Sequence, residues 1–182
     1  MIITNNEELL RAQCKNVLPE EVGTLVNTLE KELEYANRLG SNGIGLAAPQ
    51  IGILQKIAII RLGKIKINLV NSEIIQFYDK VLFQDEGCLS FPSKLLDTYR
   101  YQEVQVSNNL VEPYSFIATG FLAIAVQHEI DHFNSTLFMD RMVPKPITVV
   151  KATKVGPNEP CPCGQVDLIS GKIKKFKKCH GK

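Results

Sequence analysis

The stretch Gln127-His128-Glu129-Ile130-Asp131-His132 determines how this sequence is interpreted, and it follows an apolar run over residues 121–126. It has the form HExxH. Four residues of α-helix advance about one turn, so His128 and His132 project from the same face. Two imidazoles at this spacing can bind one divalent metal ion, with Glu129 beside them as a general base. The alternative is a buried helix with two hydrogen-bonded histidines.

Two observations favour the metal site over a buried pair of histidines. The chain has three histidines, and two of them lie in this motif. Charged residues inside an apolar helix are also costly unless something pairs with them. A catalytic metal needs a third protein ligand, and Glu129 points about 100° away from His128 around the helix. Cys88, in a loop that contains glycine, is the best remaining candidate, and Cys14 is the other thiol in residues 1–150.

Composition predicts a globular domain with a small appendage. The chain has 182 residues, 45% of them hydrophobic, and a net charge of +2. Residues 1–150 carry 13 Lys and Arg against 17 Asp and Glu, whereas residues 151–182 carry 8 Lys against 2 acids. The basic end either meets an anionic partner or is simply a solvated lysine-rich segment. Because no apolar run reaches membrane length and no signal peptide is visible, we expect a cytoplasmic protein that does not bind membranes.

Periodicity predicts a mixture of helices and strands. Apolar residues at helical spacing indicate an amphipathic helix over residues 20–38, and the HExxH helix should end near Asn134. Strands are predicted at residues 56–61, 64–70, 81–84, 103–107 and 114–118, and residues 1–18 suggest a short strand and a turn. The predicted class is α+β.

Three motifs together resemble those of the peptide deformylases. They are GIGLAAPQ at 43–50, EGCLS at 86–90 and QHEIDH at 127–132, and the similarity spans residues 1–143. The resemblance implies a compact α+β fold with antiparallel sheets around the central HExxH helix. It also implies hydrolysis of the N-formyl group of newly made N-formylmethionyl chains in the cytoplasm, or in the organelle compartment that translates with formylmethionine. The family metal is usually Fe²⁺, which Ni²⁺, Co²⁺ or Zn²⁺ can replace.

The resemblance also implies a role for each matching residue. Cys88, His128 and His132 would bind the metal, and Glu129 would act as general base and acid. The oxyanion would be held by the Gln50 side-chain amide and the Leu89 backbone N–H. The backbone of Ile44 and Gly45 would align the peptide, with Gly43 beside them in the substrate site.

Helix spacing suggests a slot for the methionine side chain. The residues that share a face with His128 and would line this slot with Ile44 are Phe121, Ile124 and Ala125. The alternative is that this stripe is part of the buried core, where such stripes are found more often than in pockets. Gln84 stands where the family usually has an aliphatic residue, so either the slot is more polar or Gln84 turns away. Arg100 is predicted either to brace Asp131 behind the metal or to be a surface arginine.

The end of the chain predicts a second metal site. We expect a catalytic domain at residues 1–146, a proline-containing linker at 147–155 and a tail at 156–182. The tail offers four ligands for a structural Zn²⁺, namely Cys161, Cys163, Cys179 and His180. It resembles a SEC-C motif with a longer connector between the cysteines; a disordered basic tail with incidental thiols is the alternative. The expected partner is the ribosome or a chaperone.

Two other functions compete with a deformylase. A zincin-type metallopeptidase would carry its third ligand downstream of HExxH, whereas Cys88 lies upstream. An inactive deformylase-like binding module would not need Gln50, Cys88 and Glu129 together with both histidines.

Overall fold

A computed structural model describes residues 1–143, 157–158, 175 and 178 of the chain. The chain divides into one unit at Met1–Val143 and a second at Pro144–Lys182. The fold below is that of the first unit, which ends three residues before the predicted domain boundary at 146. The four predicted tail ligands, Cys161, Cys163, Cys179 and His180, lie outside the described residues.

The N-terminal part is helical. The helix α1 (Glu7–Leu10) is one turn long, and the Asn6 side chain caps it by accepting from the Leu9 N–H. The predicted strand over residues 1–18 is therefore wrong, because this local cap stabilises a turn of helix instead. A 3₁₀ turn, η1 (Pro19–Glu21), leads into α2 (Val22–Arg38), which confirms the helix predicted over residues 20–38.

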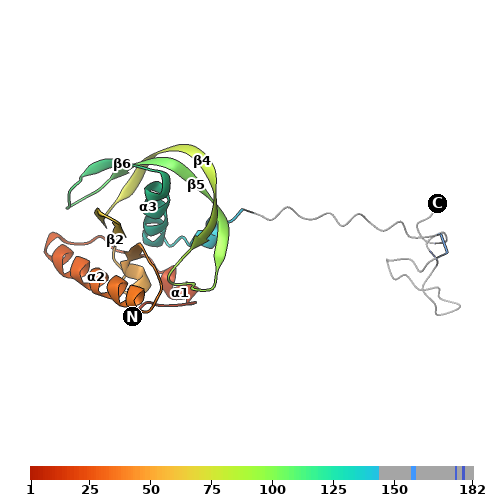
Figure 1. Cartoon of the computed structure of the whole chain (residues 1–182), viewed down its shortest axis with the longest axis horizontal. Helices are drawn as coiled ribbons and strands as arrows, with labels where there is room; N and C mark the ends of the chain where they lie inside the picture. The colour runs from red at the N-terminus through yellow and green to blue at the C-terminus, as the bar shows by residue number, and fades with distance from the viewer. Residues whose placement is uncertain (144–156, 159–174, 176–177, 179–182) are drawn as a thin grey trace. The chain divides into compact units, whose positions relative to one another are not determined.

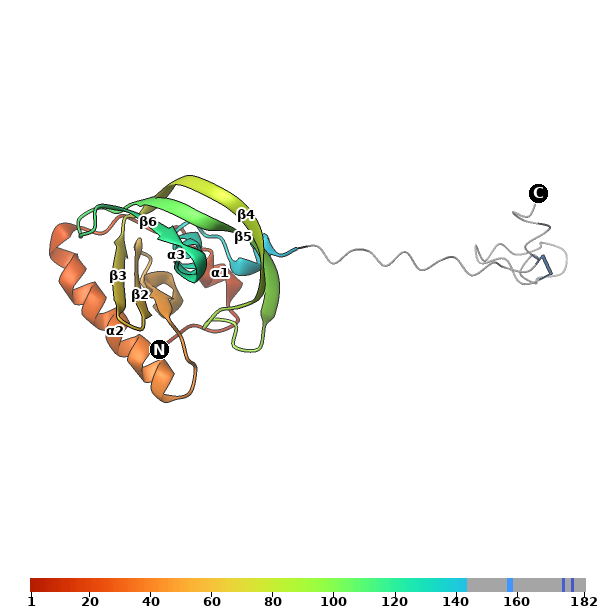
Figure 2. The same cartoon turned by 45° about the horizontal axis from the view of Figure 1, so that its top comes forward.

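The first sheet has three antiparallel strands in the order β1 (Gly45–Ala47), β2 (Ile57–Leu62), β3 (Ile65–Val70). Its faces are divided by strand alternation. Ile57 and Ile59 pack with the apolar stripe of α2, whereas Ala58 and Ile60 pack toward α3 (Gly120–Phe133). Figure 2 shows α2 lying along one face of this sheet. A 3₁₀ turn, η2 (Ala48–Ile51), follows β1, which lies at the edge of the sheet.

The second sheet is a long antiparallel ribbon of β4 (Glu73–Gly87), β5 (Leu95–Ser107) and β6 (Ser115–Thr119). The predicted strands at 81–84 and 103–107 lie within β4 and β5. The rest of β4 was not predicted because most of the strand is exposed, so apolar and polar residues do not alternate along it, and its pairing with β5 has register shifts, one between Phe83 and Glu86. This ribbon curves over α3 (Figure 1).

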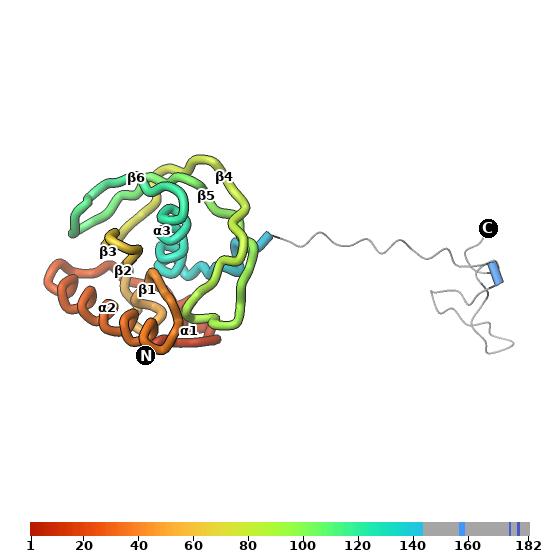
Figure 3. Tube along the Cα trace, viewed as in Figure 1, coloured from red at the N-terminus to blue at the C-terminus, as the bar shows by residue number. Residues whose placement is uncertain are grey.

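The HExxH helix α3 lies between the two sheets, as the tube in Figure 3 shows. It is followed by a 3₁₀ turn, η3 (Phe138–Arg141). The predicted α+β class, with antiparallel sheets around this helix, is confirmed. No helix among the described residues is long and apolar enough to span a membrane.

Candidate active site and metal centre

Three potential metal ligands converge where α3 meets the end of β4. One ligand atom from each of Cys88, His128 and His132 lies within 4.8 Å of the others. The Cys88 Sγ and the His132 Nε2 are 3.6 Å apart. Ordinary zinc–sulfur and zinc–nitrogen bond lengths at a tetrahedral angle place such atoms about 3.5 Å apart. The spacing therefore fits one shared divalent ion.

The environment of the two histidines also suits a cation. Burial lowers the pKa of His132, so its imidazole is neutral and offers a lone pair. Burial alone would lower the pKa of His128, but the neighbouring Cys88 and Glu86 outweigh it and raise that pKa well above its ordinary value. A negative potential that favours a proton at this position also favours a metal ion.

Glu86 orients the first histidine of the motif. The His128 Nδ1 lies 2.6 Å from the Glu86 Oε1, so Nδ1–H donates to the carboxylate and Nε2 is left for a metal. Arg100 donates to both Glu86 oxygens, from Nε at 2.8 Å and Nη2 at 2.6 Å. Burial raises the pKa of Glu86, but the hydrogen bonds from His128 and Arg100 outweigh it and lower that pKa to about 2.

Arg100 joins this carboxylate to the helix that carries the motif. Its side chain is 2% exposed, and its Nη1 lies 2.6 Å from the Asp131 Oδ2. Arg100 was predicted either to contact Asp131 behind the metal or to lie on the surface. The structure shows the contact with Asp131. Glu86 was missed as a functional residue, although its place in EGCLS, two residues before Cys88, was a usable signal.

Glu129 is a buried carboxylate with an unused oxygen. It is 5% exposed, and its Oε2 has no hydrogen-bond partner among the described residues. Burial raises the pKa of Glu129 to about 7, with the neighbouring Glu86 acting in the same direction. A carboxyl group with this pKa can both accept and return a proton near neutral pH. Gly45 makes room for it, since a Cβ there would lie 2.3 Å from the Glu129 Oε1.

Gln50 and Leu89 also lie next to Cys88. The Gln50 Oε1 accepts from the Ala47 N–H at 2.8 Å, which turns its Nε2 toward the Cys88 Sγ at 3.5 Å and the Ser90 Oγ at 3.2 Å. Within residues 1–143, no backbone carbonyl accepts from the Leu89 N–H. Two N–H donors thus flank the candidate ligand Cys88, and Ser90 was not singled out from the sequence.

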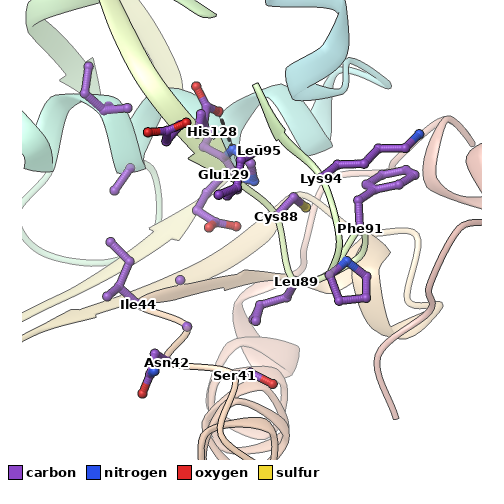
Figure 4. A pocket seen from close by; sticks show the side chains of 18 of the residues that line it. Ser41, Asn42, Ile44, Cys88, Leu89, Phe91, Lys94, Leu95, His128 and Glu129 are labelled. Carbon is purple, nitrogen blue, oxygen red and sulfur yellow. Dashed lines mark hydrogen bonds and ion pairs between the residues drawn. The ribbon is translucent and has the colours of Figure 1, made fainter. Parts of the chain in front are cut away.

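A pocket of about 550 Å³ opens at this site. Figure 4 shows Cys88, His128 and Glu129 on one side of this pocket and Ile44 and Leu89 on the other. Every residue predicted for the substrate site also lines it, namely Gly43, Ile44, Gly45, Phe121, Ile124 and Ala125.

Gln84 turns away from the pocket, which is the second of the two alternatives predicted for it. Its side chain is exposed and does not line the pocket. Between Phe83 and Glu86, β4 has one residue more than the paired segment of β5. The extra residue is accompanied by a left-handed backbone at Asp85, with φ of 54°. Phe83 then lines the pocket in place of Gln84, with its ring centroid 6.0 Å from that of Phe121.

Comparisons with known proteins point to one family. The family model described as "Polypeptide deformylase" matches residues 1–146. Peptide deformylase 1 of Bacillus subtilis is 38% identical over 147 residues, covering 78% of this chain and 88% of its own. Peptide deformylase 2 of Vibrio cholerae is 38% identical over 149 residues, covering 79% and 86%.

Solved structures give the same result. The peptide deformylase from Thermotoga maritima has a TM-score of 0.69 and 32% identity, covering 79% of this chain and 97% of its own. That from Synechococcus elongatus, in complex with actinonin, has a TM-score of 0.71 and 33% identity, covering 80% and 79%. The chain belongs to the polypeptide deformylase family, whose members are metallohydrolases that remove the N-formyl group from newly made polypeptides.

Proposed function

We propose that Cys88, His128 and His132 hold the catalytic divalent ion, Fe²⁺ in cells, and that Glu129 transfers the protons. The observation that supports this most strongly is the convergence of one thiol, two imidazoles and one carboxylate without a partner at a single pocket. A divalent ion bound by these ligands supplies Lewis acidity, which lowers the pKa of water and polarises a carbonyl group. Elemental analysis of anaerobically purified protein tests the identity of the ion.

The protein's own residues then carry out hydrolysis in two proton transfers. Glu129 accepts a proton from water as the oxygen attacks the formyl carbon. The Gln50 side-chain amide and the Leu89 N–H donate hydrogen bonds to the oxygen that becomes negative, and one such donor is worth about 3–4 kcal/mol in a known protease. Glu129 returns the proton to the amine nitrogen as the carbon–nitrogen bond breaks. The products are formate and a free amino terminus.

The free edge of β1 aligns the substrate. Among the described residues β1 pairs with β2 alone, which leaves its other edge open beside Ile44 and Gly45. An extended peptide can add to such an edge through backbone hydrogen bonds. The first side chain, methionine, then enters the apolar part of the pocket formed by Phe121, Ile124 and Ala125.

The substitution Glu129→Gln tests the assignment of the proton carrier. The variant keeps all three metal ligands and loses the group that exchanges protons. We expect an unchanged metal content and a loss of formate release from a formyl-Met peptide by at least about 100-fold. Turnover near the parent rate would reject Glu129 as the general base.

We propose further that the tail is a recruiting module built around a structural Zn²⁺ held by Cys161, Cys163, Cys179 and His180. Soft ligands of this number suit a closed zinc site, and so small a fold needs a metal for stability. The basic charge of residues 151–182 suits an anionic surface such as ribosomal RNA. This places the enzyme near emerging formylated chains.

Two measurements on the full chain test the tail. The double substitution Cys161→Ser with Cys163→Ser should remove one of two bound ions and leave turnover of a short peptide unchanged. Replacing the lysines at 174, 175, 177 and 178 with glutamine should abolish salt-sensitive co-sedimentation with ribosomes. Sedimentation that persists in this variant, or that survives nuclease treatment and moderate salt in the parent, would point to a protein partner such as a chaperone.

A further inference from the structure

Arg141 lies in η3, outside all three sequence motifs, and yet it contacts the helix that carries HExxH. Its Nη2 lies 2.7 Å from the Asp131 Oδ1, and its Nε lies 3.1 Å from the Asp131 Oδ2. The guanidinium thus holds both carboxylate oxygens in a two-pronged contact. Asp131 is next to His132 in the sequence and three residues after His128.

The Arg141 contact completes a chain of hydrogen bonds that leads to a proposed metal ligand. Asp131 accepts from Arg100, Arg100 donates to Glu86, and Glu86 accepts from the His128 Nδ1–H. Glu86, Arg100 and Asp131 are each 7% exposed or less. Every link in this chain is a charge-assisted bond.

The charges of these hydrogen-bonded residues explain why Arg141 is needed. Glu86 and Asp131 are both buried, and both bind the guanidinium of Arg100. Arg141 supplies the second cation. Without it, Arg100 would be drawn toward Asp131, because an unpaired buried carboxylate is costly. The hydrogen bonds from Arg100 to Glu86 would then weaken, and Glu86 would orient His128 less firmly.

We propose that Arg141 is a positioning residue for the metal centre, acting through Asp131, Arg100 and Glu86. This inference rests on the proposed metal site. The side chain of Arg141 is 47% exposed, so solvent screens its attraction to Asp131, which is 9% exposed and keeps the bond from Arg100 when Arg141 is replaced. The effect of Arg141 should therefore appear in metal binding more than in overall stability.

The neighbouring residue in η3 provides a matched control. Asp140 is held by Arg11 through two bonds of 2.7 Å and 2.9 Å. The two arginines are both partly exposed, 33% for Arg11 and 47% for Arg141, whereas Asp140 at 39% is more exposed than Asp131 at 9%. Arg11 has no bond to Asp131. Arg11→Met thus removes an ion pair from the same turn without touching the chain of bonds to His128.

The experiment measures Co²⁺ affinity by chelator competition in the full chain carrying Cys161→Ser and Cys163→Ser, so that the tail does not compete for metal. Loss of an outer partner of a metal ligand typically weakens metal binding 10–100-fold. We expect about 10-fold weaker binding for Arg141→Met, a smaller loss for Arg141→Lys, and less than 2-fold for Arg11→Met. In the Zn²⁺-loaded protein, the downfield proton NMR signal of His128 Nδ1–H should shift only in the two Arg141 variants.

Equal Co²⁺ affinities for Arg141→Met and Arg11→Met would overturn the positioning role and leave the proposed function intact. A parent chain that binds no Co²⁺ at all would instead reject the metal centre, and this inference with it. If Arg141→Met does not fold, Arg141→Lys decides, because it loses the two-pronged contact. Co²⁺ affinity equal to that of Arg11→Met would then overturn the positioning role.

Discussion

Replacing Gly45 with alanine should disable catalysis without disturbing the fold. The added Cβ would lie 2.3 Å from the Glu129 Oε1 and 2.9 Å from its Cδ, whereas ordinary van der Waals contacts begin near 3.4 Å. The carboxylate must therefore move by about 1.1 Å. Gly45 is not among the residues with positive φ, so alanine is compatible with the backbone there.

The size of the effect follows from this displacement. A misplacement of about 1 Å can cost on the order of 100-fold in rate, equivalent to about 2.7 kcal/mol of activation free energy. The group that moves is the end of a flexible side chain beside an open pocket, so unfolding free energy should change little. The metal ligands lie on other residues, and metal content should be unchanged.

The assay is formate release from a formyl-Met peptide, with metal content and thermal unfolding measured on the same preparations. Gly23→Ala is the control, because a Cβ at Gly23 meets nothing within 4 Å. In the first turn of α2, where helix propensity counts for less than in the interior, it should stabilise the protein by less than about 1 kcal/mol and leave kcat/KM unchanged. A Gly45→Ala enzyme within a few-fold of the parent rate would refute the close approach of Gly45 to Glu129, and a loss of bound metal would show that the change spread to the ligands.

Three further predictions concern the metal, the pocket and acid stability. Cys88→Ala leaves two imidazoles, so elemental analysis should find one ion fewer than in the parent, and full occupancy would remove Cys88 from the ligand set. Phe83→Ala should lower kcat/KM for a formyl-Met peptide about 10-fold through lost apolar contact, whereas Gln84→Ala should change it little; the reverse order would contradict the pocket lining. The hydrogen bond from Arg11 lowers the pKa of Asp140, so this pair stabilises the fold above the ordinary aspartate pKa of about 4 and loses that effect as pH falls through the lower folded value. The difference in melting temperature between the parent and Arg11→Met should therefore be largest near neutral pH and shrink in acid, and a constant difference would reject this assignment.

Much of the candidate site could be predicted from the sequence because its features are local. His128 and His132 share a helix face through the period of the α-helix alone, and the apolar run before them predicted a buried helix. Cys88 could be proposed because a catalytic metal requires a third ligand and residues 1–150 hold one other thiol, Cys14. The resemblance to the family's motifs then suggested roles for Gln50 and Leu89.

The tertiary structure decided everything that depends on how distant segments pair. Whether Arg100 lies on the surface or beside Asp131 depends on the register of β5 against β4 and on the packing of α3, and no local pattern encodes either. The same register places Glu86 behind His128. One extra residue in β4 brings Phe83 rather than Gln84 into the pocket, because a single-residue shift in a strand reverses the side to which its side chains point. Arg141 reaches Asp131 because the chain folds back after α3, a contact between side chains ten residues apart that periodicity does not reveal.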